Sequence, residues 1–300
     1  MTDNLRGILA VLVGSTAFVM NDALVKLTSP ELPASQINAI RGTVATILLA
    51  AICSAAGAWR PLPVLFSPMM LLRVGTAAAA STFIAVGLRY MPLPTMTTVM
   101  QVAPLAVTAG AALVYGERVG WRRWLAVVAG FTGVILIVKP GGGAFGSAAY
   151  IALIALLCIT VRDLTTRGLD RDIPSLLVAT ASTGAIALGG VAFAIADGAW
   201  SMPSAQAWTY LLSAGACLVA ANLFVIIALR TGEIAVIAPF RYAPVPLSLW
   251  FGWQWWGDVL DPVSFVGIGL IVAAGLYTLH RERASLGKAP APALKRSTAE

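Results

Sequence analysis

Charge is scarce in this 300-residue chain, since Asp, Glu, Lys and Arg make up 11% of it while hydrophobic residues make up 59%. A soluble domain carries roughly 25% charged residues. The deficit excludes a soluble globular protein and indicates an integral membrane protein. Apolar segments occupy almost the whole length, so there is no room for a sizeable soluble domain.

Histidine and cysteine are rare as well. His280 lies at the end of the last apolar segment, and Cys53, Cys158 and Cys217 lie inside three others. This spacing offers neither a disulfide framework nor a metal site. An intramembrane enzyme needs a nucleophile, base or metal cluster at one depth. We therefore predict a protein that is not an enzyme and that uses no cofactor and no metal.

The net charge of +7 comes from basic residues in short loops between apolar segments. Placing the N-terminus inside puts fifteen Lys and Arg in the inner loops and tail, against Lys26, Arg89 and Lys139 outside. This is the positive-inside pattern, so we expect membrane lipid rather than nucleic acid as the partner. Both termini are predicted to be cytoplasmic, in a bacterial-type cytoplasmic (inner) membrane.

The apolar pattern predicts ten transmembrane helices in an all-α integral membrane fold. Their expected bounds are 6–27, 36–57, 71–89, 94–115, 123–139, 148–167, 175–196, 207–229, 234–256 and 262–280. Residues 284–300 are rich in Ala, Pro, Lys and Ser, which predicts a disordered basic tail.

The two halves of the chain repeat each other. At an offset of 141 residues Asp22 matches Asp163, Lys26 matches Arg167, and Gly116-Glu117 matches Gly257-Asp258; at 140, Ala103-Pro104 matches Ala243-Pro244. Each repeat, 1–139 and 144–283, holds five predicted helices. Because five is odd, the second repeat must cross the membrane in the opposite sense. An inverted repeat of this kind is an architecture of alternating-access transporters.

Two predicted helices contain breaks at corresponding positions. Pro239, Pro244 and Pro246 interrupt the segment 234–256, and each removes a backbone donor. Freed backbone groups at membrane depth are tolerated only beside protein or a wet cavity. Gln101 and Pro104 stand at the matching place in the first half. Such paired breaks predict a substrate site between the repeats.

Arg241 is the main candidate for substrate binding, because a guanidinium suits a carboxylate or phosphate. The alternative is that it holds carbonyls freed by Pro244 and Pro246. Tyr242 beside it would stack on a planar ligand. Arg41, in the second predicted helix, is either a second anchor or a residue that extends to lipid head groups.

Gln101 and Asn222 are polar residues at mid-membrane, where each is either a ligand for substrate or a hydrogen bond between helices. Trp253, Trp255 and Trp256 suit an aromatic interface belt. Trp250 lies deeper and is a candidate for a cavity wall.

Two charge pairs have the i,i+4 spacing that lets side chains meet on one helix face. They are Asp22 with Lys26 and Asp163 with Arg167. Either they are local pairs, or one belongs to an outer gate and the other to an inner gate. Glu117 and Asp258 lie at helix ends, where loop or helix-end roles are expected.

These motifs resemble a known family. The residues that carry the resemblance are Asn21-Asp22, Lys26, Arg41, Pro104, Tyr115-Gly116-Glu117, Gly130 and Gly133, repeated more loosely by Pro244, Gly257-Asp258 and Gly275. Over residues 1–283 the chain resembles two EamA modules of the drug/metabolite transporter superfamily. The resemblance implies a transport function and a central cavity lined by the first, third and fourth helices of each half. The sequence departs from the family pattern at Ser182, where Arg41 would repeat.

We therefore predict a secondary transporter that moves a small organic metabolite, such as an amino acid, cofactor or vitamin, by alternating access. Arg241 favours an anionic or zwitterionic substrate. The alternatives are a multidrug-type exporter of hydrophobic cations and, further off, an intramembrane lipid-modifying enzyme. Either a monomer or a homodimer is compatible with the sequence.

Overall fold

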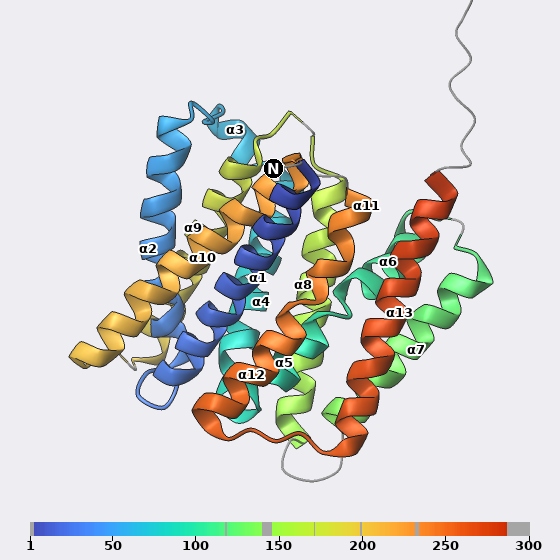
Figure 1. Ribbon diagram of the computed structural model, residues 1–300. Coiled ribbons are helices and arrows are strands. Elements are labelled where there is room, and N and C mark those ends of the chain that lie inside the picture. Colours follow the sequence, from blue (N-terminus) through green and yellow to red (C-terminus); the bar gives the residue numbers. More distant parts are fainter. Residues whose placement is uncertain are drawn as a thin grey trace, which may run out of the picture.

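The computed structural model describes residues 3–117, 119–139, 146–170, 172–198, 200–231 and 234–286. Every regular element within these ranges is a helix (Figure 1). The first half contains α1 (Asp3–Thr28), α2 (Ala34–Ala55), α3 (Leu62–Leu65), α4 (Pro68–Tyr90), α5 (Leu93–Met100), α6 (Ala103–Val114) and α7 (Trp121–Val138). The second half contains α8 (Gly146–Arg167), α9 (Ser175–Asp197), α10 (Ala205–Thr231), α11 (Ile234–Ile237), the 3₁₀ helix η1 (Ala238–Tyr242), α12 (Pro244–Trp256) and α13 (Pro262–Leu286).

Nine stretches of the described chain are long and apolar enough to cross a membrane. They coincide with nine of the ten predicted spans, and α5 and α6 together form one of them. The tenth predicted span, 234–256, is divided into α11, η1 and α12. The predicted tail falls largely on 287–300, which lies outside the described residues.

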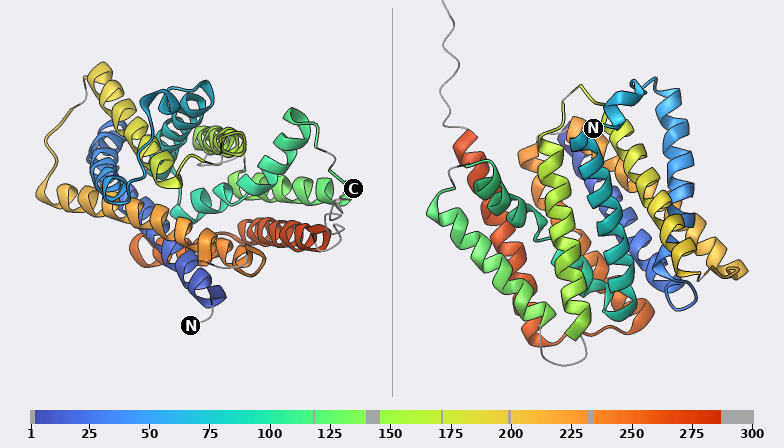
Figure 2. Two further views of the ribbon diagram at one scale, coloured as in Figure 1. Left: turned by 90° about the horizontal axis from the view of Figure 1, so that it is seen from above. Right: turned by 180° about the vertical axis from the view of Figure 1, so that it is seen from behind.

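Each long helix packs mainly against a helix of the other half. α1 lies along α10, α2 along α9, α4 along α8, α7 along α13, and α5 against α12. Exchanging the halves converts the four pairs of long helices into themselves, because α1 with α10 becomes α8 with α4. Figure 2 shows α7 and α13 on one side of the molecule and α2 with α9 on the other. α1 begins and α13 ends at the same end of the bundle (Figure 1).

Ser and Thr hydroxyls inside the helices are satisfied locally. Thr28 donates to the carbonyl of Leu24 at 2.7 Å, and Thr160 donates to that of Leu156 at 2.7 Å. A buried hydroxyl without a partner costs free energy, so bonding to the preceding turn lets these residues sit in an apolar interior. The large buried cluster runs through both halves and includes Leu88, Leu105 and Ile271.

The α7–α13 contact depends on two glycines that face each other. A Cβ on Gly133 would lie 2.6 Å from the carbonyl oxygen of Gly267, and one on Gly267 would lie 2.7 Å from that of Gly133. Small residues let helix backbones approach closely in membranes. Gly133 and Gly267 therefore let α7 and α13 pack closely within one chain, so these two glycines are not free to form a dimer contact.

Gly267→Ala is expected to lower the thermal stability of the purified protein, because the new methyl group meets backbone that cannot move aside. Overpacking of this kind typically costs about 1–3 kcal/mol. Gly269→Ala is the matched control on the same helix, since nothing lies within 4 Å of a Cβ there. Melting temperatures in one detergent would test this. Equal melting temperatures for the two variants would contradict the close crossing.

Candidate functional site

The two spans predicted to be interrupted are both broken. The first breaks between α5 and α6 at Gln101 and Val102, with Pro104 in the first turn of α6. The second breaks at η1, and Pro244 is the first residue of α12. Proline lacks the N–H that would continue the helical bonding. The interruptions thus follow directly from the proline positions.

A side chain from one break binds the backbone of the other. Gln101 Nε2 donates to the carbonyl oxygen of Arg241 at 2.7 Å. The two residues occupy matching positions in the two halves, 140 residues apart. Gln101 was considered both as a link between helices and as a ligand for substrate. In this conformation its amide N–H links the two breaks.

The Arg241 side chain is exposed, and the described part of the chain makes no hydrogen bond or ion pair with its guanidinium. Among the described residues it donates no hydrogen bond to the carbonyls freed by Pro244 and Pro246, while the carbonyl of Arg241 itself is bound by Gln101 from another helix. Pro104 is also exposed, and Phe240 is 37% exposed. The guanidinium donors are therefore without a partner among the described residues.

Other predicted binding residues are engaged elsewhere. The Tyr242 ring is 7% exposed and occupies the space where Gly275 of α13 has no side chain. Asn222 Nδ2 donates to the carbonyl of Leu218 in its own helix at 2.8 Å. Trp250 is 54% exposed and packs edge-on against Phe251, with ring centroids 4.8 Å apart. A stacking role for Tyr242 would require its ring to leave this position.

Arg41 is 5% exposed and lies at the centre of a polar network between α1, α2 and α4. Its NH1 donates to Asn21 Oδ1 at 2.9 Å, and its NH2 donates to Asn38 Oδ1 at 2.7 Å and to Ser81 Oγ at 2.6 Å. Asn21 in turn donates to Asp22 Oδ1 at 2.9 Å. The proposed extension of Arg41 to head groups is wrong, because three helices supply acceptors inside the bundle. Its Nε is buried without a partner among the described residues.

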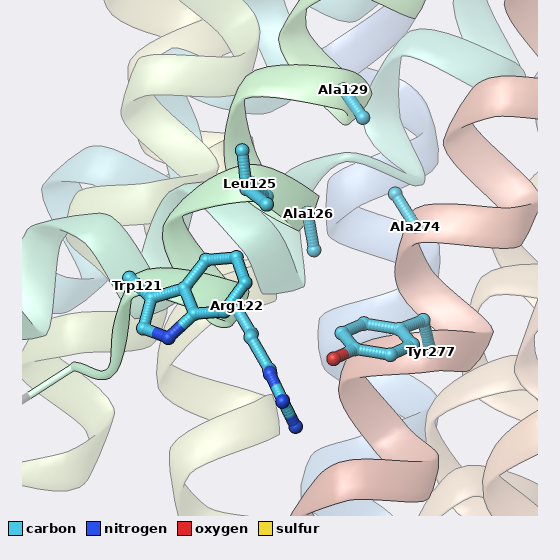
Figure 3. A pocket seen from close by; sticks show the side chains of 7 residues that line it. All are labelled: Trp121, Arg122, Leu125, Ala126, Ala129, Ala274 and Tyr277. Carbon is cyan, nitrogen blue, oxygen red and sulfur yellow. The ribbon is translucent and has the colours of Figure 1, made fainter.

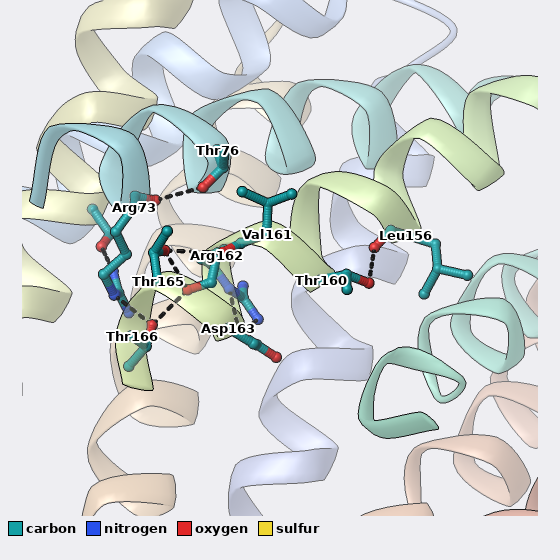
Figure 4. Close-up of polar contacts among 10 residues, drawn as sticks. Arg73, Thr76, Leu156, Thr160, Val161, Arg162, Asp163, Thr165 and Thr166 are labelled. Carbon is teal, nitrogen blue, oxygen red and sulfur yellow. Dashed lines mark hydrogen bonds and ion pairs between the residues drawn. The ribbon is translucent and has the colours of Figure 1, made fainter. Parts of the chain in front are cut away.

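A second network occupies the other half (Figure 4). Ser182, where Arg41 would repeat, accepts a hydrogen bond from Arg73 NH1, and Arg73 Nε donates to Thr166 Oγ1 at 3.0 Å. Arg162 Nε donates to Asp163 Oδ1 at 2.9 Å. The second half has no arginine at position 182, and Arg73 on α4 supplies a cation there instead. Arg73 is one of the fifteen basic residues that the sequence assigns to the inner loops and tail, and no local signal distinguishes it.

The two predicted i,i+4 pairs do not form. Lys26 Nζ donates to the carbonyls of Leu88 and Met91, at 3.1 and 2.7 Å, near the end of α4. Arg167 NH1 lies 3.7 Å from Glu117 Oε1, and Asp163 pairs with its neighbour Arg162. The predicted pairing of Lys26 with Asp22 was wrong because the last carbonyls of a helix lack partners in that helix and attract a nearby cation. The predicted pairing of Arg167 with Asp163 was wrong because each has a charged partner elsewhere. Whether these residues gate the protein is a separate question.

Two pockets lie away from the broken spans. A cavity of about 370 Å³ opens between α7 and α13 (Figure 3). The residues that line it are Trp121, Arg122, Leu125, Ala126, Ala129, Ala274 and Tyr277. Another of about 170 Å³ lies between the end of α1 and the start of α10. None of the residues predicted to bind substrate lines either one. The described residues also hold no group of three His, Cys, Asp or Glu side chains suited to a metal.

An all-helical membrane bundle in which two interrupted spans meet is typical of secondary transporters, whose sites lie where discontinuous helices face each other. The EamA-like transporter family matches residues 5–139. Residues 5–139 thus carry an EamA-like transporter domain, and the relatives of the chain bear the names of transporters, not of enzymes.

The relatives carry names of transporters for different small molecules. A riboflavin transporter of Rhizobium johnstonii is 29% identical over 71% of this chain and 70% of that protein. A pseudopaline exporter of Pseudomonas aeruginosa is 28% identical over 89% of this chain and 93% of its own. An S-adenosylmethionine uptake transporter of Rickettsia prowazekii is 22% identical over 67% of each. A solved crystal structure with 20% identity and a TM-score of 0.65 covers 94% of this chain and 98% of its own, which shows a shared fold.

Arg41→Met is expected to destabilise the protein strongly, because Asn21 and Asn38 would lose their buried donor. Breaking a buried charged network costs about 3–5 kcal/mol. Arg89→Met, at an exposed arginine of α4, is the control and is expected to change stability little. Thermal unfolding of both variants in detergent would measure the difference. A stable Arg41→Met protein would show that the network does not hold the three helices together.

Proposed function

We propose that this protein is a secondary transporter that moves a small organic metabolite with an anionic or zwitterionic group across a bacterial cytoplasmic membrane by alternating access. The observation that carries this proposal is the meeting of the two broken spans, with the Arg241 guanidinium left without a bonding partner among the described residues. A planar fork of donors at membrane depth suits a carboxylate or phosphate. Amino acids, cofactors and vitamins with such groups form the proposed substrate class.

The names of the relatives support a metabolite substrate in general terms. Riboflavin, pseudopaline and S-adenosylmethionine are all small organic molecules. The names include both uptake and export, so they support no direction of transport for this chain. The substrate class proposed here therefore depends on Arg241 and not on any single relative.

The proposed architecture has ten spans in two inverted repeats, residues 1–139 and 144–283, with 234–256 as a broken ninth span. The helix pairs support it, because α1 with α10 becomes α8 with α4 when the halves are exchanged, and α2 with α9 and α7 with α13 each map onto themselves. The start of α1 and the end of α13 lie at one end of the bundle. With the basic loops, this supports two cytoplasmic termini. The proposed architecture is compatible with either a monomer or a homodimer.

Arg241→Gln is expected to abolish ligand binding in a protein that still folds. A ligand that binds only the folded state stabilises it by about 2.7 kcal/mol at a hundred times its Kd. Thermal unfolding of the purified wild type against amino acids, nucleosides, cofactors and cationic drugs would reveal the class. An anionic or zwitterionic metabolite should raise the melting temperature of the wild type with concentration, and should not raise that of Arg241→Gln.

Two further variants separate charge from geometry in the same experiment. Arg89→Gln removes an exposed arginine elsewhere and should retain the ligand effect. Arg241→Lys keeps the charge without the planar fork and should bind more weakly than the wild type. If only hydrophobic cations stabilise the protein, and stabilise Arg241→Gln equally, the anionic substrate is excluded and a multidrug-type exporter is the better assignment.

A further inference from the structure

Lys26 connects three helices at one end of the bundle. Its ammonium group binds the carbonyls of Leu88 and Met91 on α4 and lies 5.4 Å from the centre of the Trp256 ring at the end of α12. Asp258 follows two residues after α12, and its charge interacts with Lys26. One cation thus joins the end of α1 to the ends of α4 and α12.

This Lys26 contact is partly buried. Asp258 Oδ2 is buried without a hydrogen bond among the described residues. Burial raises the pKa of Asp258, while the Lys26 ammonium and the backbone N–H of Leu93 act against the rise. Nearby, Gly252 lets α12 approach α5, because a Cβ there would lie 2.8 Å from Pro94. The end of the bundle that holds Lys26 is tightly packed.

Arg167 makes the corresponding contact at the opposite end, since α1 and α8 run in opposite directions (Figure 1). Its NH1 lies 3.7 Å from Glu117 Oε1, and the two side chains are 48% and 54% exposed. Tyr115 Oη, just after α6, donates to the carbonyl of Leu164 on α8 at 3.1 Å. This Arg167 contact is longer and more open to solvent than the Lys26 contact.

The two contacts are built from matching residues. At the offset of 141, Lys26 corresponds to Arg167, Trp256 to Tyr115, and Asp258 to Glu117. In each, a cation near the end of the first helix of one half lies near an acid that follows the fourth span of the other half. The aromatic residues contact the same helices differently: Trp256 lies against the Lys26 ammonium, and Tyr115 donates to the Leu164 carbonyl on the helix that carries Arg167. The i,i+4 spacing pointed to partners within one helix, whereas the structure joins the cations to residues of the opposite half.

We propose that the Lys26 contact and the Arg167 contact are the two gates of the transport cycle, and that each tightens as the other loosens. The inference rests on the proposed alternating access. If the two similar halves exchange conformations, the Lys26 contact loosens and the Arg167 contact closes. The structure then represents a state closed at the Lys26 end.

Accessibility of introduced cysteines tests the gates without a ligand. Met91→Cys, at a residue 2% exposed, reports opening of the Lys26 end, and Leu113→Cys, at 79%, reports closing of the Arg167 end. Alkylation of the full-length protein in membranes, quantified at each cysteine by peptide mass spectrometry, gives both rates. Cys53, which is 0% exposed, serves as an internal sensor of unfolding.

Lys26→Gln is expected to raise alkylation at Met91→Cys several-fold and to lower it at Leu113→Cys, with Cys53 unchanged. Lys26→Arg, which keeps the charge and the donors, should behave as the wild type. Adding Glu117→Gln to Lys26→Gln should return both rates toward the wild-type values, because the Arg167 end then cannot tighten. Lys139→Gln is the control, since Lys139 binds Asp261 at 2.7 Å between α7 and α13, and it should change neither rate.

Unchanged alkylation rates at both introduced cysteines in Lys26→Gln would overturn the proposal. A rise in alkylation at Cys53 together with the rise at Met91→Cys would also overturn it, because Lys26 would then have a purely structural role. The result is independent of the substrate experiment. If alkylation changes in opposite directions at Met91→Cys and Leu113→Cys, the gates are supported even when Arg241→Gln binds ligand normally. If Arg241→Gln loses ligand binding, that result does not bear on the gates, and only the alkylation rates test them.

Discussion

The structure depends on one constraint, which is that every backbone N–H and C=O inside a membrane must find a partner. Prolines break two spans, and the bond from Gln101 to the Arg241 carbonyl joins the breaks across the two halves. That bond leaves the Arg241 guanidinium available. A feature that appears as a defect in a single helix thus creates a polar position where the two halves meet, which is where we propose that the substrate binds.

Two cations, Arg41 buried and Arg73 partly buried, join helices of the bundle, and they arise differently in the two halves. Arg41 on α2 gathers acceptors from α1 and α4, whereas Arg73 on α4 reaches Ser182 on α9 and Thr166 on α8. The repeats are therefore alike in helix order and unlike in chemistry. Such asymmetry suits a protein whose two halves perform the same motion while only one carries the Arg241 side chain.

The ends of the bundle combine strong and weak contacts. At one end a lysine meets helix carbonyls and a partly buried carboxylate, and at the other an arginine and a glutamate meet in solvent. Exposed ion pairs are weak, so the second contact can form and break with little change in free energy. A cycle between two states needs contacts of this kind, because a ligand shifts an equilibrium only by its difference in affinity for the two states.

Much of the fold followed from the sequence alone. Hydropathy determines the spans and prolines determine where two of them break, because both effects act within a single segment; nine candidate spans and both breaks are as predicted. The sequence also determined that Gln101 and Arg241 correspond. Tertiary structure alone decided the partners of the charges. Lys26, Arg73 and Arg167 each have long, flexible side chains, and their partners lie on other helices, often in the other half. No local spacing encodes those contacts, since they exist only once the two halves have packed.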